Sequence, residues 1–146
     1  MDANLIVGRE PRALAFAVAL VFAGVQSISA LAADVKVTIS GDQEVPPVKT
    51  SAKGSGTITV NNDKTLSGRV TTTGVDATAA HIHEGASGKN GGVIVPLTKA
   101  GDNAWTVAAG AKFTDAQYTA FQAGNLYVNV HSAANKDGEI RGQLKP

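Results

Sequence analysis

The chain has 146 residues, a length that fits one domain, and a formal charge of +1 at neutral pH, from 13 Lys and Arg against 12 Asp and Glu. This balance, without a cluster of basic residues, excludes an electrostatic nucleic-acid binder. The lack of cysteine excludes disulfides, iron–sulfur clusters and thiolate-ligated copper.

The N-terminal segment has the pattern of an export signal. Arg9 and Arg12 precede an apolar run over residues 13–25, and small residues with an A-x-A motif follow. This order predicts a secretory signal peptide over residues 1–32. The alternative is a membrane anchor, but the run is shorter than the roughly 20 residues that a span needs. Cleavage would leave a periplasmic or secreted domain over residues 33–146, without stable membrane association.

The remaining chain is expected to form short strands separated by turns. Val35, Val37 and Ile39 alternate with polar residues, which is typical of a half-buried strand. The turn residues 61–64 join two alternating segments into a hairpin. The expected strands cover residues 35–39, 55–61, 65–73, 75–83, 93–97, 105–107, 125–131 and 139–144.

One helix is indicated by its capping residues. Thr114 is a candidate N-cap with Gln117 as its capping-box partner, and Gly124 stands where a C-terminal glycine is expected. The helix is therefore predicted from about Asp115 to Ala123. The pattern as a whole predicts an all-β fold, an antiparallel β-sandwich or flattened barrel, with one short helix before the penultimate strand.

All three histidines fall in two predicted strands. His81 and His83 are two apart, so their imidazoles share one face while Ile82 turns to the other. His131 ends a later strand whose alternate residues are apolar. If the fold brings His131 over the pair, three neutral imidazoles form a site for copper or zinc. The alternative is that the histidines are structural and form hydrogen bonds between strands.

Copper is the favoured metal and zinc the alternative, because both accept imidazole ligands and Cu(II) binds more tightly in the Irving–Williams order. A ligand imidazole usually has a partner that orients its second ring nitrogen. The carboxylate candidates for this role are Glu44, Glu84, Asp137 and Glu139.

Other polar residues near these motifs have simpler interpretations. Glu44 could instead cap a backbone N–H group beside two prolines. Glu139 and Arg141 share one face of the last strand, which predicts an ion pair between them. Tyr127 and Asn129 share the face of His131, where they line the site or simply pack. Three further aromatic residues are expected in the core: Trp105, Tyr118 and Phe121.

Four motifs in order resemble the CHRD (chordin) domain family over residues 35–144. They are Gly41-x-x-Glu44-Val45-Pro46-Pro47, Ala80-His81-Ile82-His83, Asn125-Leu126-Tyr127-Val128-Asn129-Val130-His131 and Gly138-Glu139-Ile140-Arg141-Gly142. The resemblance implies an extracellular or periplasmic β domain and no settled activity.

The histidine pattern is also similar to that of the Cu/Zn superoxide dismutases, which are Greek-key β-sandwiches. Those enzymes ligate copper with a His-x-His pair on one strand and a histidine on a late strand, which His81, His83 and His131 match. The resemblance also offers Arg141 as a counterpart of the arginine near the copper. No fourth histidine is present, so the bridging ligand and the zinc subsite have no counterpart.

These observations lead to three hypotheses about function. The first is an exported copper-binding protein for storage, delivery or detoxification, binding one metal ion per chain and losing it below about pH 6 as the imidazoles protonate. The second is a dismutase-like copper oxidoreductase that uses Arg141. The third is a non-catalytic interaction module with structural histidines. We favour binding over catalysis, and short edge strands would be compatible with a homodimer.

Overall fold

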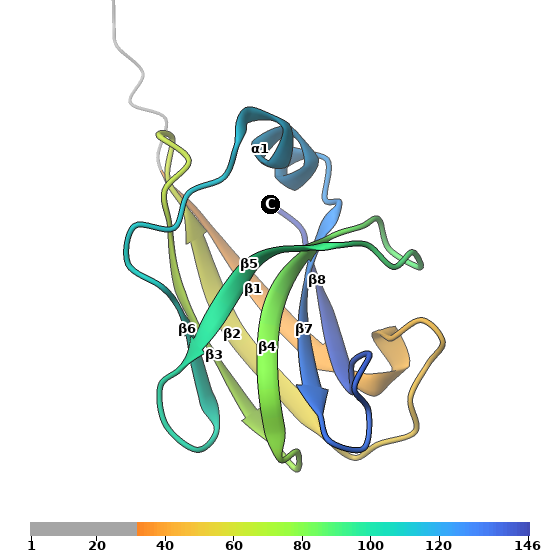
Figure 1. Ribbon diagram of the computed structural model, residues 1–146. Coiled ribbons are helices and arrows are strands. Elements are labelled where there is room, and N and C mark those ends of the chain that lie inside the picture. The colour runs from red at the N-terminus through yellow and green to blue at the C-terminus, as the bar shows by residue number, and fades with distance from the viewer. Residues whose placement is uncertain (1–31) are drawn as a thin grey trace, which may run out of the picture.

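The protein is an eight-stranded antiparallel β-barrel with one α-helix (Figure 1). The computed structural model describes residues 32–146, so the expected signal peptide lies, except for its last position, outside the described residues. The elements are β1 (Ala33–Ser40), the short 3-10 helix η1 (Gly41–Gln43), β2 (Lys53–Val60), β3 (Leu66–Thr73), β4 (Ala77–Glu84), β5 (Val93–Lys99), β6 (Ala104–Val107), α1 (Asp115–Gln122), β7 (Leu126–Ser132) and β8 (Ile140–Leu144). Within residues 32–146, no helix is long and apolar enough to cross a membrane.

The strands form a ring in the order β1-β2-β3-β6-β5-β4-β7-β8. The predicted hairpin is confirmed as β2 and β3, which pair along their full length from Lys53 and Thr73 to Val60 and Leu66. The sequence left open whether the sheets form a sandwich or a barrel. The ring closes where Ser40 of β1 pairs with Arg141 of β8, so the fold is a closed barrel.

Closure also bears on the expected homodimer, which was argued from exposed edge strands. A closed barrel has no complete free edge. The most loosely joined neighbours are β1 and β8, which share a single residue pair. The dimer therefore stays a prediction, without support from a free edge strand in the described chain.

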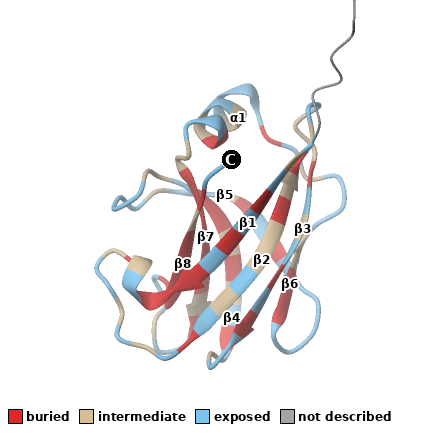
Figure 2. Cartoon of the chain, turned by 180° about the vertical axis from the view of Figure 1, so that it is seen from behind, coloured by how far each residue is buried: buried red, intermediate tan, exposed pale blue. Residues whose placement is uncertain are grey.

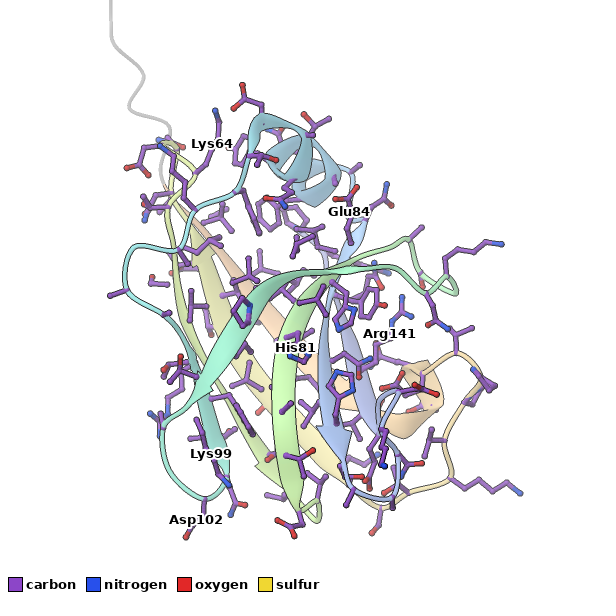
Figure 3. All side chains as sticks on the ribbon, in the orientation of Figure 1. Lys64, His81, Glu84, Lys99, Asp102 and Arg141 are labelled. Carbon is purple, nitrogen blue, oxygen red and sulfur yellow. The ribbon has the colours of Figure 1, made fainter. Side chains whose placement is uncertain are left out.

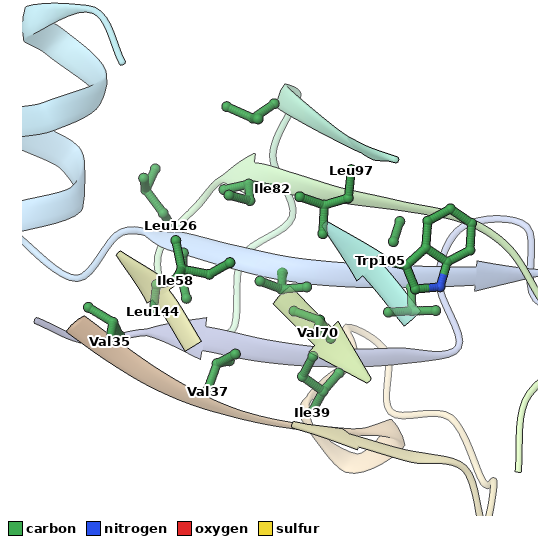
Figure 4. Packing of buried hydrophobic residues seen from close by; sticks show 14 of the residues in the cluster. Val35, Val37, Ile39, Ile58, Val70, Ile82, Leu97, Trp105, Leu126 and Leu144 are labelled. Carbon is green, nitrogen blue, oxygen red and sulfur yellow. The ribbon is translucent and has the colours of Figure 1, made fainter. Parts of the chain in front are cut away.

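The barrel interior is filled by the apolar residues of the alternating strands (Figure 4). On β1, Val35, Val37 and Ile39 point inward, and Ile82 and Val128 do so from β4 and β7. Figure 2 shows the resulting alternation of buried and exposed positions along β1. The predicted period-2 pattern is confirmed, and it leaves residues 79, 81 and 83 of β4 and residues 127, 129 and 131 of β7 on the outer face of the barrel.

Helix α1 precedes the penultimate strand, as predicted, and it covers one end of the barrel (Figure 1). Thr114 accepts from the backbone N–H of Gln117, and the Gln117 side chain accepts from the backbone N–H of Thr114, which completes the capping box. Phe121 of the helix packs into the core cluster. Gly124 follows with a φ of +73°, a conformation that favours glycine and ends the helix.

Candidate metal centre

The three imidazoles meet on the outer face of strands β4 and β7. In the register of these strands, His83 is opposite Tyr127, His81 is opposite Asn129, and His131 is opposite Ala79. The side chains of one face on adjacent strands are neighbours, so the pairing brings His131 diagonally beside His81. Figure 3 shows His81 on this face, with Arg141 farther along it.

The geometry of the three side chains fits a metal ion. Each offers one ring nitrogen, and the three nitrogens lie within 4.8 Å of one another. Tetrahedral ligands at the zinc–imidazole distance of about 2.0–2.1 Å stand roughly 3.4 Å apart. Small side-chain rotations would therefore bring the nitrogens to ligand spacing. The sequence-predicted convergence of His81, His83 and His131 is present in the structure.

The hydrogen bonds of the rings define which nitrogen carries the lone pair. Nδ1 of His83 lies 3.0 Å from the carbonyl oxygen of Gly91, and Nδ1 of His131 lies 2.8 Å from that of Lys136. A carbonyl oxygen only accepts, so both Nδ1 atoms carry hydrogen and both Nε2 atoms have free lone pairs. Nε2 of His83 is buried and has no partner.

His81 completes the set through a different nitrogen. Its Nδ1 lies 3.1 Å from Nε2 of His131, so in the metal-free protein it donates a hydrogen bond to that lone pair. An ion at this point would replace that hydrogen, and His81 would then carry its proton on Nε2. The nitrogens available to an ion would therefore be Nδ1 of His81 and Nε2 of both His83 and His131.

The environment favours the uncharged form of His81 and His83. Burial lowers the pKa of His81, and repulsion from His131 and His83 lowers it further. Burial also lowers the pKa of His83, although the bond to Gly91 acts in the opposite direction. Neutral imidazoles are the form that binds metal.

The orienting partners differ from those predicted. Glu44, Glu84, Asp137 and Glu139 were the candidates, but within residues 32–146 the Nδ1 partners of His83 and His131 are backbone carbonyl groups. Both carbonyls come from loops folded back over the strands. Gly91 approaches so closely that a Cβ atom there would lie 1.5 Å from the carbonyl oxygen of Glu84, so only glycine fits.

Tyr127 supports His83 from the neighbouring strand. The two rings stack at a centroid distance of 4.9 Å and an angle of 15°. The Tyr127 hydroxyl accepts a hydrogen bond of 3.0 Å from the backbone N–H of Gly91, which holds the loop whose carbonyl orients His83. Of the two roles that the sequence left open for Tyr127, the structure shows packing, against His83, and it also places the ring in the lining of the cavity at His83.

Arg141 is a structural residue of the same layer. Its guanidinium carbon lies 3.5 Å from the centroid of the Tyr127 ring, and the side chain is 1% exposed. It donates to the carbonyl oxygens of Ala86 and Lys89 and to the side chain of Asn90. Arg141 therefore fastens the β4–β5 loop over the site.

The predicted ion pair between Glu139 and Arg141 is wrong. Glu139 instead accepts hydrogen bonds from the hydroxyl groups of Thr50 and Ser132, which lower its pKa. Arg141 donates its hydrogen bonds to the carbonyl oxygens of Ala86 and Lys89 in the β4–β5 loop instead.

A cavity of about 350 Å³ opens in front of His83. Its lining is Val45, Pro46, His83, Asn90, Gly91, Tyr127, Asn129 and Asp137. The Asn90 side chain closes one side by donating to the carbonyl oxygen of Val45 at 2.7 Å. The cavity therefore gives access to His83 between the η1–β2, β4–β5 and β7–β8 loops, whereas His81 and His131 do not line it.

The family of the chain follows from a comparison with protein-family models. Residues 35–144 match the model described as the CHRD domain. Neither the curated proteins nor the solved structures gave a significant match. The matched segment runs from β1 to β8 and includes every residue of the imidazole cluster and its supporting loops. The chain therefore belongs to the CHRD domain family.

Proposed function

We propose that this protein binds one transition-metal ion, copper before zinc, through His81, His83 and His131. The observation that carries the proposal is the buried Nε2 atom of His83, which has no hydrogen-bond partner while its ring is fixed through Nδ1. A buried acceptor without a partner costs free energy, and a bound cation removes that cost. The ring nitrogens of the two other imidazoles lie within 4.8 Å of that of His83 and of each other.

The donor set is the basis for preferring copper. Three imidazoles suit both copper and zinc, and the Irving–Williams order favours Cu(II) over Zn(II) at an unconstrained site of this kind. The function proposed for the bound ion is storage, delivery or detoxification outside the cytoplasm. An exported location agrees with the expected signal peptide and is typical of CHRD domains.

We also infer a Greek-key arrangement of the kind found in the Cu/Zn superoxide dismutases. Strands β4, β5 and β6 are consecutive neighbours, and β7 returns beside β4, which gives the spatial order 7-4-5-6 of a Greek key.

The arrangement of Arg141 favours binding over a dismutase reaction. Steering of an anion requires an accessible positive charge. Arg141 is buried against Tyr127 and its donors are used by the β4–β5 loop. The interaction-module hypothesis, with purely structural histidines, is disfavoured by the unpartnered nitrogen of His83.

Calorimetric titration of the purified metal-free chain with Cu(II) and Zn(II) tests the proposal. We expect one ion per chain with nanomolar affinity for copper and weaker binding of zinc. Replacing any one of the three histidines by alanine should weaken binding at least 100-fold, whereas Glu84→Gln, an exposed carboxyl next to His83, should not. Micromolar binding that survives all three histidine substitutions would contradict the proposal. If the titration supports the proposal, elemental analysis of the protein from its native host would identify the metal.

A further inference from the structure

Two buried oxygen atoms beside the imidazole cluster lack hydrogen-bond partners. Glu44 follows the turn η1 and is 6% exposed, and Asn129 lies on β7 between His131 and Tyr127 and is 3% exposed. Neither Oε1 of Glu44 nor Oδ1 of Asn129 has a donor. Two buried acceptors without donors are costly, so the arrangement requires something that both can bind.

The two oxygens converge on one point above Gly138. A Cβ atom placed at Gly138 would lie 2.6 Å from Oε1 of Glu44 and 2.4 Å from Oδ1 of Asn129. The φ angle of Gly138 is +132°, a conformation that other residues rarely adopt. Glycine at this position thus leaves room for a carboxyl group and an amide to approach each other.

The charged groups around Glu44 do not supply the missing donor. Arg141 on β8 is near enough to stabilise the carboxylate, but its hydrogen bonds go to the β4–β5 loop. Asp42, on the turn of Glu44 itself, is acidic. Lys136 and Asp137, on the β7–β8 loop, are exposed residues at the rim of the adjoining cavity of about 250 Å³.

A single proton on the Glu44 carboxyl group would give both Oε1 of Glu44 and Oδ1 of Asn129 a hydrogen-bond partner. A protonated carboxyl group has one O–H donor, and an amide oxygen accepts it. Burial raises the pKa of Glu44 to about 7 against the opposing charge of Arg141, so the neutral form is accessible at physiological pH. A metal cation would find only these two side-chain oxygens and the positive charge of Arg141 close by, which makes it the weaker alternative.

We propose that Glu44 and Asn129 share a proton, with the Glu44 carboxyl group donating to Oδ1 of Asn129, and that this bond positions His131. The connection runs through the Asn129 amide, whose Nδ2 donates to the carbonyl oxygen of Asp137 at 3.3 Å. The preceding carbonyl, of Lys136, accepts from Nδ1 of His131 at 2.8 Å. The proposed bond would thus fix the Asn129 amide. That amide holds the β7–β8 loop, and the loop orients the His131 ring.

Glu44 and Asn129 are therefore positioning residues for the imidazole cluster. Ionisation of Glu44 would remove the donor and place two acceptors against each other. The Asn129 side chain would then turn, and the loop carbonyl that orients His131 would lose its support. The shared proton belongs to the metal-free protein, and only its consequence for metal affinity rests on the proposed function.

Nuclear magnetic resonance of the metal-free full chain, with chelator present, tests the proposal. The side-chain amide signals of Asn129 should shift with a midpoint near pH 7, and the Nδ1–H signal of His131 should weaken above it as exchange with water becomes about tenfold faster. In Glu44→Gln the uncharged amide still donates to Asn129, so both signals should keep their low-pH form up to pH 8.5.

Four results would overturn the proposal. The Asn129 transition could be absent, or it could persist in Glu44→Gln, in which case the histidines cause it. The Asn129 signals could respond at neutral pH to millimolar Mg²⁺ or Ca²⁺, which would identify a cation as the occupant. An Asn129 transition without any change at His131 would refute the positioning role. None of these measurements requires that the protein bind copper or zinc.

Discussion

The stability that Glu44 contributes should fall as the pH rises toward neutrality, and Glu44→Gln should remove that contribution. The pKa of Glu44 is raised from 4.5 to about 7 in the folded protein. A carboxyl group with a raised folded-state pKa contributes stability that is complete below the unfolded value and is lost as the pH rises through the folded value. The loss is therefore expected between about pH 4.5 and 7, and it is complete above pH 8.

The magnitude follows from the gap between the two pKa values. At roughly 1.4 kcal/mol per pKa unit, a rise from 4.5 to about 7 corresponds to at most about 3 kcal/mol. Glu44 borders cavities of about 400 and 250 Å³, through which solvent screens its charge. We therefore expect about 2 kcal/mol, or a shift of about 8 °C in Tm for a domain of this size.

The assay compares urea unfolding of the wild type and of Glu44→Gln from pH 5 to pH 8.5 in chelator. The other titrating groups, including the histidines and Glu139, are common to both proteins and cancel in the difference. The two should be about equally stable at pH 5, and the variant should be the more stable by about 2 kcal/mol at pH 8.5. A difference that is flat with pH, or that favours the wild type at high pH, would refute the reasoning.

Three further predictions concern the fold. Thr114→Ala should lose about 1 kcal/mol of stability because it removes the helix cap, whereas Thr114→Ser should keep most of the stability that the cap contributes. Chemical denaturation of both variants measures the difference. Gly138→Ala should cost more than about 2 kcal/mol by strain and by collision with Glu44 and Asn129; Gly110→Ala, also at positive φ but with open space around it, should cost about 1 kcal/mol. Ile82→Ala should cost about 2–4 kcal/mol of stability because it leaves a cavity in the barrel, and Ile94→Ala should cost clearly less because Ile94 is only partly buried. Thermal unfolding of both variants measures the two losses.

The sequence was informative wherever a local rule decides the structure. The period of two placed Ile82 inward and the flanking histidines outward, because adjacent strand residues alternate between faces. The capping box predicted the helix start at Asp115 to the residue, since Thr114 and Gln117 satisfy each other's backbone groups regardless of tertiary context.

The sequence was uninformative where backbone atoms and loops decide the contacts. The carbonyl groups of Gly91 and Lys136 orient two imidazoles, and any residue type supplies a carbonyl group. Strand alternation placed Glu139 and Arg141 on one face, but the β4–β5 loop folds over Arg141 and takes its donors. Closure of the barrel was likewise open, since it depends on the single pairing of Ser40 with Arg141.

The same alternation makes the imidazole cluster independent of the hydrophobic core. Ile82 and Val128 fill the barrel from the strands that carry the histidines, and they point away from the cluster. Replacing an imidazole leaves the interior packing untouched, so histidine variants should fold, and a loss of metal binding in them reports on the site itself. The residues that support His83 are not independent of one another in this way. Gly91 of the β4–β5 loop and Tyr127 of β7 are hydrogen-bonded to each other, and both contact His83. Substitutions there should weaken binding by disordering the ring, and they should also lower stability, because a Cβ atom at Gly91 would collide with the carbonyl oxygen of Glu84 and the Tyr127 side chain is buried.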